Sequence, residues 1–308
     1  MSEKYETIVP SEPDAGERLQ WVSWLRSAAP YVHLHHGRTF VISFAGEVVA
    51  DRTLLNHLVM DVSLIASMGM RVVLVHGSRP QIEELMSLRK LEGQFYKGVR
   101  ITGPQELECV KEACGETRFD IEAAFSQGLP NTPMQHSRIK VVSGNFVTAR
   151  PMGIIDGVDY LHTGVVRKVD AESIQDLLSR GNIVLVSPTG FSPTGEAFNL
   201  TTEDVATAIA VAIHADKLIL SVGVDGVRIQ GEKQQDLTAQ QAQALIQSKQ
   251  VDDEDVYNLG YALRAIKGGV DRVHIVPYAM DGGILTELFT HDGVGTMIST
   301  AVSYTHLT

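Results

Sequence analysis

The chain has 308 residues, of which 44% are hydrophobic and 20% are charged, and its formal net charge is −11. This length and apolar content are sufficient for one large α/β domain or two smaller ones with a substantial core. Because the chain is acidic and has no block of lysine and arginine, nucleic acids and anionic membranes are excluded as expected partners. The longest apolar region, residues 205–224, contains His214, Asp216 and Lys217, which indicates a buried core segment and not a membrane span.

The N-terminal region combines a polar tail with a helix of unusual pattern. Residues 1–14 are expected to form a mobile tail without a signal peptide. The predicted helix over residues 17–29 carries one stripe with Leu19 and Val22 and another with Trp21 and Trp24. The two stripes together could form one broad core face. A terminal helix with two tryptophans on a separate stripe is better suited to lying between two surfaces, so we expect a subunit contact.

Histidines and cysteines give little sign of a metal site or a disulfide. His33, His35 and His36 lie close together but have no carboxylate or cysteine partner in place, so we interpret them as a solvated connector and predict no metal. Cys109 and Cys114 lie five residues apart on a predicted helix and cannot define a disulfide framework. Such cysteine usage fits a reduced, cytoplasmic setting.

Beyond residue 39, short apolar runs alternate with helical patterns. Strands are predicted within residues 39–49, 72–75, 183–187, 217–222 and 273–276, with helices at 54–67, 104–119, 173–180, 203–214, 237–247, 256–267 and 283–289. Residues 138–170 depart from this alternation, because short strands broken at Gly144-Asn145 and Asp156-Gly157 indicate a run of β-hairpins. The pattern predicts a three-layer αβα sandwich around a mainly parallel sheet.

The stretch from Arg71 to Leu85 has the frame of a phosphate site. A buried strand, a tight loop and a helix N-terminus follow one another, and Pro80 fits the first helical turn. Free backbone N–H groups at such a junction form a natural anion site. Here the loop contains Ser78 and Arg79 where an open anion site would have glycine. The strand, loop and helix of a phosphate site are therefore present, but two of the loop residues differ.

Six segments, in one order along residues 17–300, resemble the amino-acid kinase fold, and within it the branch of acetylglutamate kinases and N-acetylglutamate synthases. They read VISFAGEVV, LVHGSRPQI, KGVRIT, FNLTTEDVA, ADKLILSVGVDGV and HIVPYAMDGGILTELFTHDGVGTMI. The last is the most diagnostic, since ELFT-x-x-G-x-G-T resembles the arginine-responsive element of that branch. The resemblance implies one kinase-like domain over residues 15–300.

The same resemblance implies that the kinase chemistry is lost. Ser43 stands where the kinases have the lysine that meets the transferring phosphoryl group, and Asn258 stands at a second lysine position. Phosphoryl transfer depends on fixed cations around the developing charge, so their loss predicts a very poor kinase. We expect Ser78 and Arg79 to crowd the phosphate loop as well. The degenerate positions are Ser43, Ala45, Ser78, Arg79, Glu203 and Asn258.

N-acetylglutamate synthases are similar in these departures, and in them the kinase-like domain senses L-arginine. The resemblance implies a guanidinium contact at Glu287 and a carboxylate contact at the amides of the glycine turn. The implied allosteric arginine-binding residues are Tyr31, His274, Glu287, Gly293 and Gly295. Arg100 and Asn199 match substrate contacts of the kinases and are expected to form a vestigial pocket, with surface or turn roles as the alternative.

The expected function is therefore the arginine-sensing, kinase-dead region of an N-acetylglutamate synthase, at the first step of arginine biosynthesis. Acetyl-CoA and L-glutamate would be substrates of an acetyltransferase domain that this chain lacks, and no cofactor is expected on the chain itself. A homo-oligomer is implied, with a hexamer as one arrangement. A working acetylglutamate kinase and a non-catalytic arginine-binding assembly module remain as alternatives. Residues 301–308 do not resemble the family's linker and are expected to be a truncation scar or an artefact.

Overall fold

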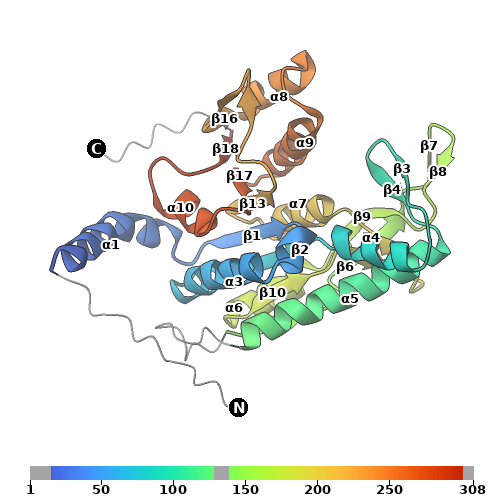
Figure 1. The fold of residues 1–308 in the computed structure, drawn as a ribbon, viewed down its shortest axis with the longest axis horizontal. Helices are drawn as coiled ribbons and strands as arrows, with labels where there is room; N and C mark the ends of the chain where they lie inside the picture. Colours follow the sequence, from blue (N-terminus) through green and yellow to red (C-terminus); the bar gives the residue numbers. More distant parts are fainter. Residues whose placement is uncertain (1–14, 128–138, 301–308) are drawn as a thin grey trace, which may run out of the picture.

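The computed structural model describes residues 15–127 and 139–300, and Figure 1 draws its fold. An eight-stranded central sheet has the order β16-β18-β17-β13-β1-β2-β10-β5. All neighbours in it pair in parallel except β17 and β18, so the prediction of a mainly parallel sheet is confirmed. The strands are β1 Thr39–Phe44, β2 Arg71–His76, β5 Val141–Ser143, β10 Ile183–Val186, β13 Lys217–Val222, β16 Asp236–Thr238, β17 Arg272–Pro277 and β18 Thr296–Ser299.

Helices cover both faces of this sheet, which is why its strands are nearly continuous apolar runs. In β1 and β2, five of the six residues are buried. Phe40, Ile42 and Leu74 belong to the core on one face, and Val41 and Val73 to the core on the other. The first face is covered by α3 Arg52–Ser67, α5 Pro104–Ser126 and α10 Gly283–Phe289, and the second by α6 Ala171–Ser179, α7 Thr202–Ala212, α8 Ala239–Ser248 and α9 Asp253–Lys267.

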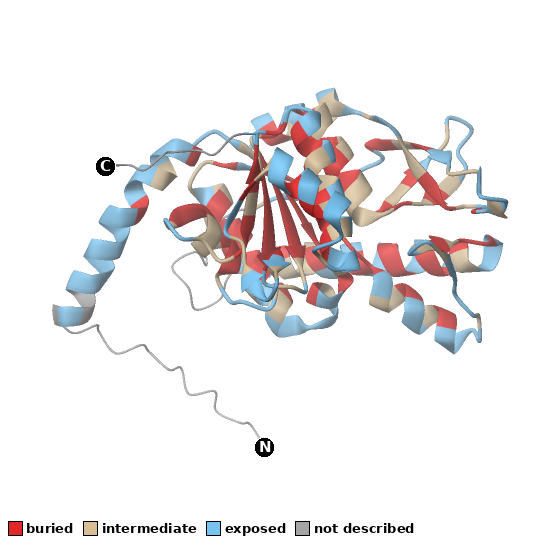
Figure 2. Cartoon of the chain, turned by 90° about the horizontal axis from the view of Figure 1, so that it is seen from above, coloured by how far each residue is buried: buried red, intermediate tan, exposed pale blue. Residues whose placement is uncertain are grey.

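The first helix, α1 Ala15–His35, extends from the body of the molecule (Figure 2). It is longer at both ends than the predicted 17–29, although Pro30 lies inside it. Its last turns are held by packing, because Tyr31 is half-buried and the Nε2 atom of His35 lies 3.0 Å from the carbonyl oxygen of Leu288. In contrast, Trp21 and Trp24 are 64% and 53% exposed.

The interpretation of the histidines as a solvated connector is wrong for His35. Its side chain is buried, and its ring meets the edges of Phe40 and Phe289 at centroid distances of 5.5 and 5.7 Å. Burial, reinforced by nearby cations such as Lys217, lowers the pKa of His35 to about 4. His33 and His36 are exposed as expected. No described helix is long and apolar enough to cross a membrane.

A smaller sheet of order β12-β11-β6-β9 lies beside the carboxyl end of the central sheet (Figure 1). The predicted hairpin at Asp156-Gly157 is confirmed, and both residues have positive φ, 51° and 81°. The predicted hairpin at Gly144-Asn145 is wrong, because β5 joins the central sheet in parallel with β10. The strands of the smaller sheet are β6 Val147–Pro151, β9 Gly164–Val169, β11 Thr189–Phe191 and β12 Ala197–Asn199. Two separate hairpins are formed by β3 Gln94–Tyr96 with β4 Val99–Ile101 and by β7 Ile154–Ile155 with β8 Val158–Asp159.

Several element boundaries differ from the predicted ones. The extended run predicted from Thr39 ends at Phe44, and a short helix, α2 Gly46–Ala50, follows it. The helix predicted to end at 119 continues to Ser126. The helix predicted over 203–214 begins at Thr202 and ends at Ala212, and Thr201 occupies the cap position without a side-chain hydrogen bond. The expectations for residues 1–14 and 301–308 lie outside the described residues.

Candidate functional site

The kinase-like loops follow β1 and β2 at the carboxyl edge of the sheet, where α/β proteins place their ligands. The second loop leads into α4 Arg79–Leu88. The two loops touch: the N–H of Gly77 donates to the carbonyl of Phe44 at 2.7 Å, and the amide of Gln81 donates to the carbonyl of Gly46 at 2.8 Å. A Cβ on Gly46 would lie 2.8 Å from Cδ of Pro80, so this contact requires glycine.

The altered residues lie in this region, but not all act as expected. Ser43 is buried near the end of β1, and Ala45 occupies the cap position of α2. Ser78 is buried with its Oγ 3.1 Å from Nδ1 of His76. The expectation that Arg79 crowds the loop is wrong, because its guanidinium is exposed and pairs with Glu83 at 3.0 Å. Pro80 and Gln81 occupy the space between the loops instead.

The second lysine position also lacks a cation. Asn258 lies on α9 and is buried, and its amide nitrogen has no hydrogen-bond partner among the described residues. The neighbouring Tyr257 donates to Glu203 of α7 at 3.2 Å, and burial raises the pKa of that carboxyl. A neutral serine and a neutral amide therefore stand at the two positions where the resemblance implies a lysine of the kinases.

The two residues expected to form a vestigial pocket, Arg100 and Asn199, are linked through hydrogen bonds. Asn199 of β12 donates to Oγ1 of Thr102 at 3.0 Å, and Thr163 bridges Thr102 (2.8 Å) and the carbonyl of Arg100 (2.6 Å). Arg100 and Asn199 are thus brought together as expected, through two threonines that sequence reasoning missed. The guanidinium of Arg100, however, is buried and lies 3.2 Å from Glu83. The hydrogen-bond donors of this guanidinium are therefore occupied by residues of the same chain.

A second polar cluster lies on α10 and the strands beneath it, toward the amino end of β13. Nζ of Lys217 lies 2.9 Å from Nε2 of His274, and Nδ1 of His274 lies 2.6 Å from Oε1 of Glu287. The other carboxylate oxygen of Glu287 accepts the N–H groups of Val294 and Gly295 at 2.8 and 2.9 Å. A hydrogen-bonded chain thus runs from a buried lysine to the glycine turn.

Burial determines the protonation of this cluster. It lowers the pKa of His274 to about 4, so the ring is neutral, donates from Nδ1 to Glu287 and accepts from Lys217 at Nε2. Burial alone would raise the pKa of Glu287, but the hydrogen bonds from His274 and from the turn outweigh it and lower this pKa to about 2. Burial also lowers the pKa of Lys217, to about 7. The cluster therefore presents a buried, ionised carboxylate.

The turn after α10 is built around that carboxylate. Gly293 has φ of +60°, and a Cβ there would lie 2.6 Å from Oε2 of Glu287. A Cβ on Gly295 would lie 2.0 Å from the carbonyl oxygen of Ile275. The structure differs from the expectation on one point, because the amides of Val294 and Gly295 bind Glu287 and are not open to a ligand carboxylate.

The predicted arginine-binding residues gather around α10. Tyr31 packs against the large core cluster on the face that α10 covers, and the last turn of α1 reaches α10 through the contact of His35 with the carbonyl oxygen of Leu288. Lys217 was missed by sequence reasoning. Its signal was present, since a lysine that opens an otherwise apolar strand, KLILSV, is buried with that strand.

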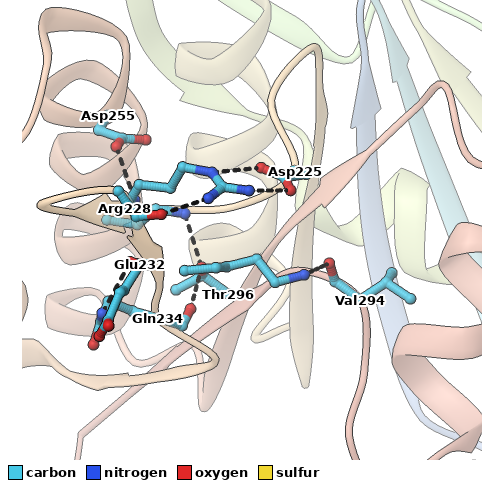
Figure 3. Close-up of polar contacts among 10 residues, drawn as sticks. Asp225, Arg228, Glu232, Gln234, Asp255, Val294 and Thr296 are labelled. Carbon is cyan, nitrogen blue, oxygen red and sulfur yellow. Dashed lines mark hydrogen bonds and ion pairs between the residues drawn. The ribbon is translucent and has the colours of Figure 1, made fainter.

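The turn after α10 also makes hydrogen bonds to residues 233–234 (Figure 3). Nζ of Lys233 donates to the carbonyl of Val294 at 2.9 Å, and Oγ1 of Thr296 donates to the carbonyl of Gln234 at 2.5 Å. Arg228 pairs with Asp225 at 2.7 Å in the same loop. The hairpin of β14 Arg228–Ile229 and β15 Glu232–Lys233 thereby fixes the peptide whose N–H binds Glu287.

Residues 38–277 match the model of the amino acid kinase family. The chain is 54% identical over 288 residues to an amino-acid acetyltransferase from Ralstonia nicotianae, a match that covers 93% of this chain and 64% of that protein. The structure is similar to N-acetylglutamate synthase from Neisseria gonorrhoeae complexed with coenzyme A and N-acetyl-glutamate, with a TM-score of 0.84, 35% identity and coverage of 91% and 64%. The same enzyme complexed with coenzyme A and L-arginine gives the same TM-score and identity, with coverage of 91% and 66%.

The chain thus spans less than two thirds of the length of these relatives. The family match covers most of the central sheet, from the residue before β1 to the end of β17. By its sequence and its fold, the chain belongs to the amino acid kinase family.

Proposed function

We propose that the chain is the arginine-sensing, kinase-dead region of an amino-acid acetyltransferase of the N-acetylglutamate synthase type. Its relatives carry that name over a longer chain, and one solved relative is complexed with L-arginine. In this proposal, the full-length protein transfers the acetyl group of acetyl-CoA to L-glutamate through a domain outside this chain. L-arginine is the feedback ligand, and the chain works in the cytoplasm.

The observation that carries the proposal is the state of Glu287. An ionised carboxylate has about four acceptor positions, and three of them are filled by His274, Val294 and Gly295. One position is left for a planar cationic donor, and a guanidinium makes strong charge-assisted hydrogen bonds to carboxylates. His35 at the end of α1 contacts Leu288, the residue after Glu287, so a ligand at Glu287 would lie near the junction of α1 and α10.

The kinase alternative has less support. Ser43 and Asn258 supply no positive charge, and the guanidinium of Arg100 is paired with Glu83. Arginine binding with assembly is compatible with the proposal, since α1 exposes Leu19, Trp21 and Trp24. We propose that this apolar stripe packs on a second copy of the chain, in a homo-oligomer for which a hexamer is one arrangement.

The test is calorimetric titration of the chain with L-arginine and, separately, with L-lysine. We expect saturable binding of L-arginine and much weaker binding of L-lysine, because an ammonium is a compact, strongly hydrated point charge and lacks the planar donor group of a guanidinium. Equal affinities would reject the guanidinium site. No heat and no saturation with L-arginine would reject the sensor proposal.

A further inference from the structure

A cavity of about 290 Å³ lies at the carboxyl ends of β5 and β10, between α5 and the smaller sheet. Nothing in the proposed function uses it. Four strand-to-strand steps separate β10 from β17, which at roughly 4.8 Å per step places the cavity about 19 Å across the sheet from the strand of His274. Its polar walls come from Arg118, Ser143, Asn145, Ser187 and Thr189.

One cation and one anion stand side by side at this cavity. Nε of Arg118 lies 3.7 Å from Oε1 of Glu122, one helical turn further along α5. The same carboxylate oxygen accepts the hydroxyl of Ser143 at 2.8 Å. Because the hydroxyl hydrogen of Ser143 is used in this way, its oxygen can only accept a hydrogen bond from a ligand.

The hydroxyl of Ser187 is oriented by a buried histidine. Nδ1 of His76 lies 3.1 Å from the carbonyl oxygen of Gly77, which can only accept, so Nδ1 carries the hydrogen. Nε2 of His76 is then an acceptor, and Ser187 donates to it at 2.8 Å. Ser187 therefore also presents only acceptor capacity to the cavity, about which Arg118 presents hydrogen-bond donors.

We propose that this cavity binds a small α-amino acid as its zwitterion, with the carboxylate on Arg118 and the ammonium on the hydroxyl oxygens of Ser143 and Ser187. A carboxylate matches the donor fork of arginine, and an ammonium supplies only donors. The negative charge of Glu122 behind Ser143 favours the ammonium. An aliphatic ligand side chain packs on the apolar lining, which Val147, Leu185, Val186 and Phe191 form.

The volume fits this ligand class. The cavity equals about ten water molecules at ~30 Å³ each and lies at the lower end of ligand pockets. It is too small for a nucleotide and suits an amino acid with a short aliphatic side chain. The inference is independent of the arginine cluster, which uses other residues.

The probes are L-leucine, 4-methylpentanoate and 3-methylbutylamine, titrated into the whole chain and followed by calorimetry. The second probe lacks the ammonium of leucine and the third lacks its carboxylate. We expect saturable binding of L-leucine, and at least tenfold weaker binding of each analogue. No saturable binding of L-leucine would overturn the proposal, and so would an analogue that binds as well as leucine.

Variants assign the binding to this cavity. Arg118→Gln and Ser187→Ala should each weaken leucine binding at least tenfold. Arg180→Gln is the control, because Arg180, the residue after α6, also forms an ion pair with an acid four residues away, Asp176, and it should leave the affinity unchanged. Glu287→Gln should also leave it unchanged. Unaltered binding in both cavity variants, or loss of binding in Glu287→Gln, would refute the assignment.

Discussion

Two polar regions border the central sheet, and they differ in which features of a ligand site they contain. At the carboxyl ends of β1 and β2, the glycine contacts between the loops persist while Ser43 and Asn258 leave the region without its cations. Around β17 and α10, the side chains of Lys217, His274 and Glu287 form one hydrogen-bonded chain. The first region therefore has the backbone arrangement of a phosphate site without its cationic side chains. The second has a connected set of polar side chains.

The two regions are stabilised by different interactions. Close packing of Gly46 and Gly77 holds the loops together whether or not phosphate binds there. The second region has no such latitude, because removing one partner would leave a buried charge uncompensated, at a cost of about 3–5 kcal/mol. The buried cluster therefore tolerates loss of a side chain less well than the loop contacts do.

The largest expected effect concerns phosphoryl transfer at the loops after β1 and β2. We expect no N-acetylglutamate-dependent ADP release from the chain, since loss of two electrostatic stabilisers costs about 10⁴-fold or more in rate. Ser43→Lys with Asn258→Lys should still give very low activity, because Pro80 and Gln81 fill the space between the loops. A coupled ADP assay measures this. Robust turnover in the unmodified chain would show that the loops after β1 and β2 still catalyse phosphoryl transfer.

The next effect concerns association through α1. Trp21→Ser with Trp24→Ser should lower the oligomeric state, measured by sedimentation velocity, while the circular dichroism spectrum stays the same. Both side chains are exposed on the single chain, so their replacement costs the fold little. Leu88→Ser with Ile154→Ser alters equally exposed apolar residues elsewhere and is the control. An unchanged sedimentation coefficient in the tryptophan variant would exclude α1 as the contact.

A smaller effect on stability should follow from Gly295→Ala. The new methyl group would meet the carbonyl oxygen of Ile275, so we expect a loss of about 3 kcal/mol or more in the free energy of unfolding. Gly115→Ala is the control: this exposed position of α5 has open space around it, and alanine favours a helix by about 0.5–1 kcal/mol. Denaturant titration compares them. Equal stabilities would mean that the turn is not tightly packed.

The smallest expected effect is the pH dependence that His35 contributes. Its pKa is about 4 in the folded chain and 6.5 otherwise, so below pH 6.5 the unfolded chain binds a proton that the folded chain excludes. Between pH 7 and pH 5 this costs the folded state about 2 kcal/mol, at ~1.4 kcal/mol per pKa unit. His35→Gln should lose that much less stability on acidification than the unmodified chain. His33→Gln, on the exposed side of α1, should behave like the unmodified chain, and equal slopes in all three would contradict the burial of His35.

Local pattern predicted much of the fold, because strands buried on both faces read as continuous apolar runs and the resemblance supplied their order. Helix ends were less predictable: α1 continues past Pro30 to His35, whose ring contacts the carbonyl oxygen of Leu288 in α10. Hydrogen-bond partners distant in sequence were missed for the same reason. Thr102 meets Asn199, and Lys217 meets His274, only after the strands are arranged.

The central claim is that Glu287 receives the guanidinium of L-arginine, and the melting temperature tests it most directly. At a hundred times its dissociation constant, a ligand of the folded state adds about 2.7 kcal/mol, which raises the melting temperature by roughly 5 °C for a chain of this size. We predict this rise in the unmodified chain and in Glu84→Gln, an exposed acid on α4, and its near-complete loss in Glu287→Gln. A full rise in Glu287→Gln, or none in the unmodified chain at saturating L-arginine, would contradict it.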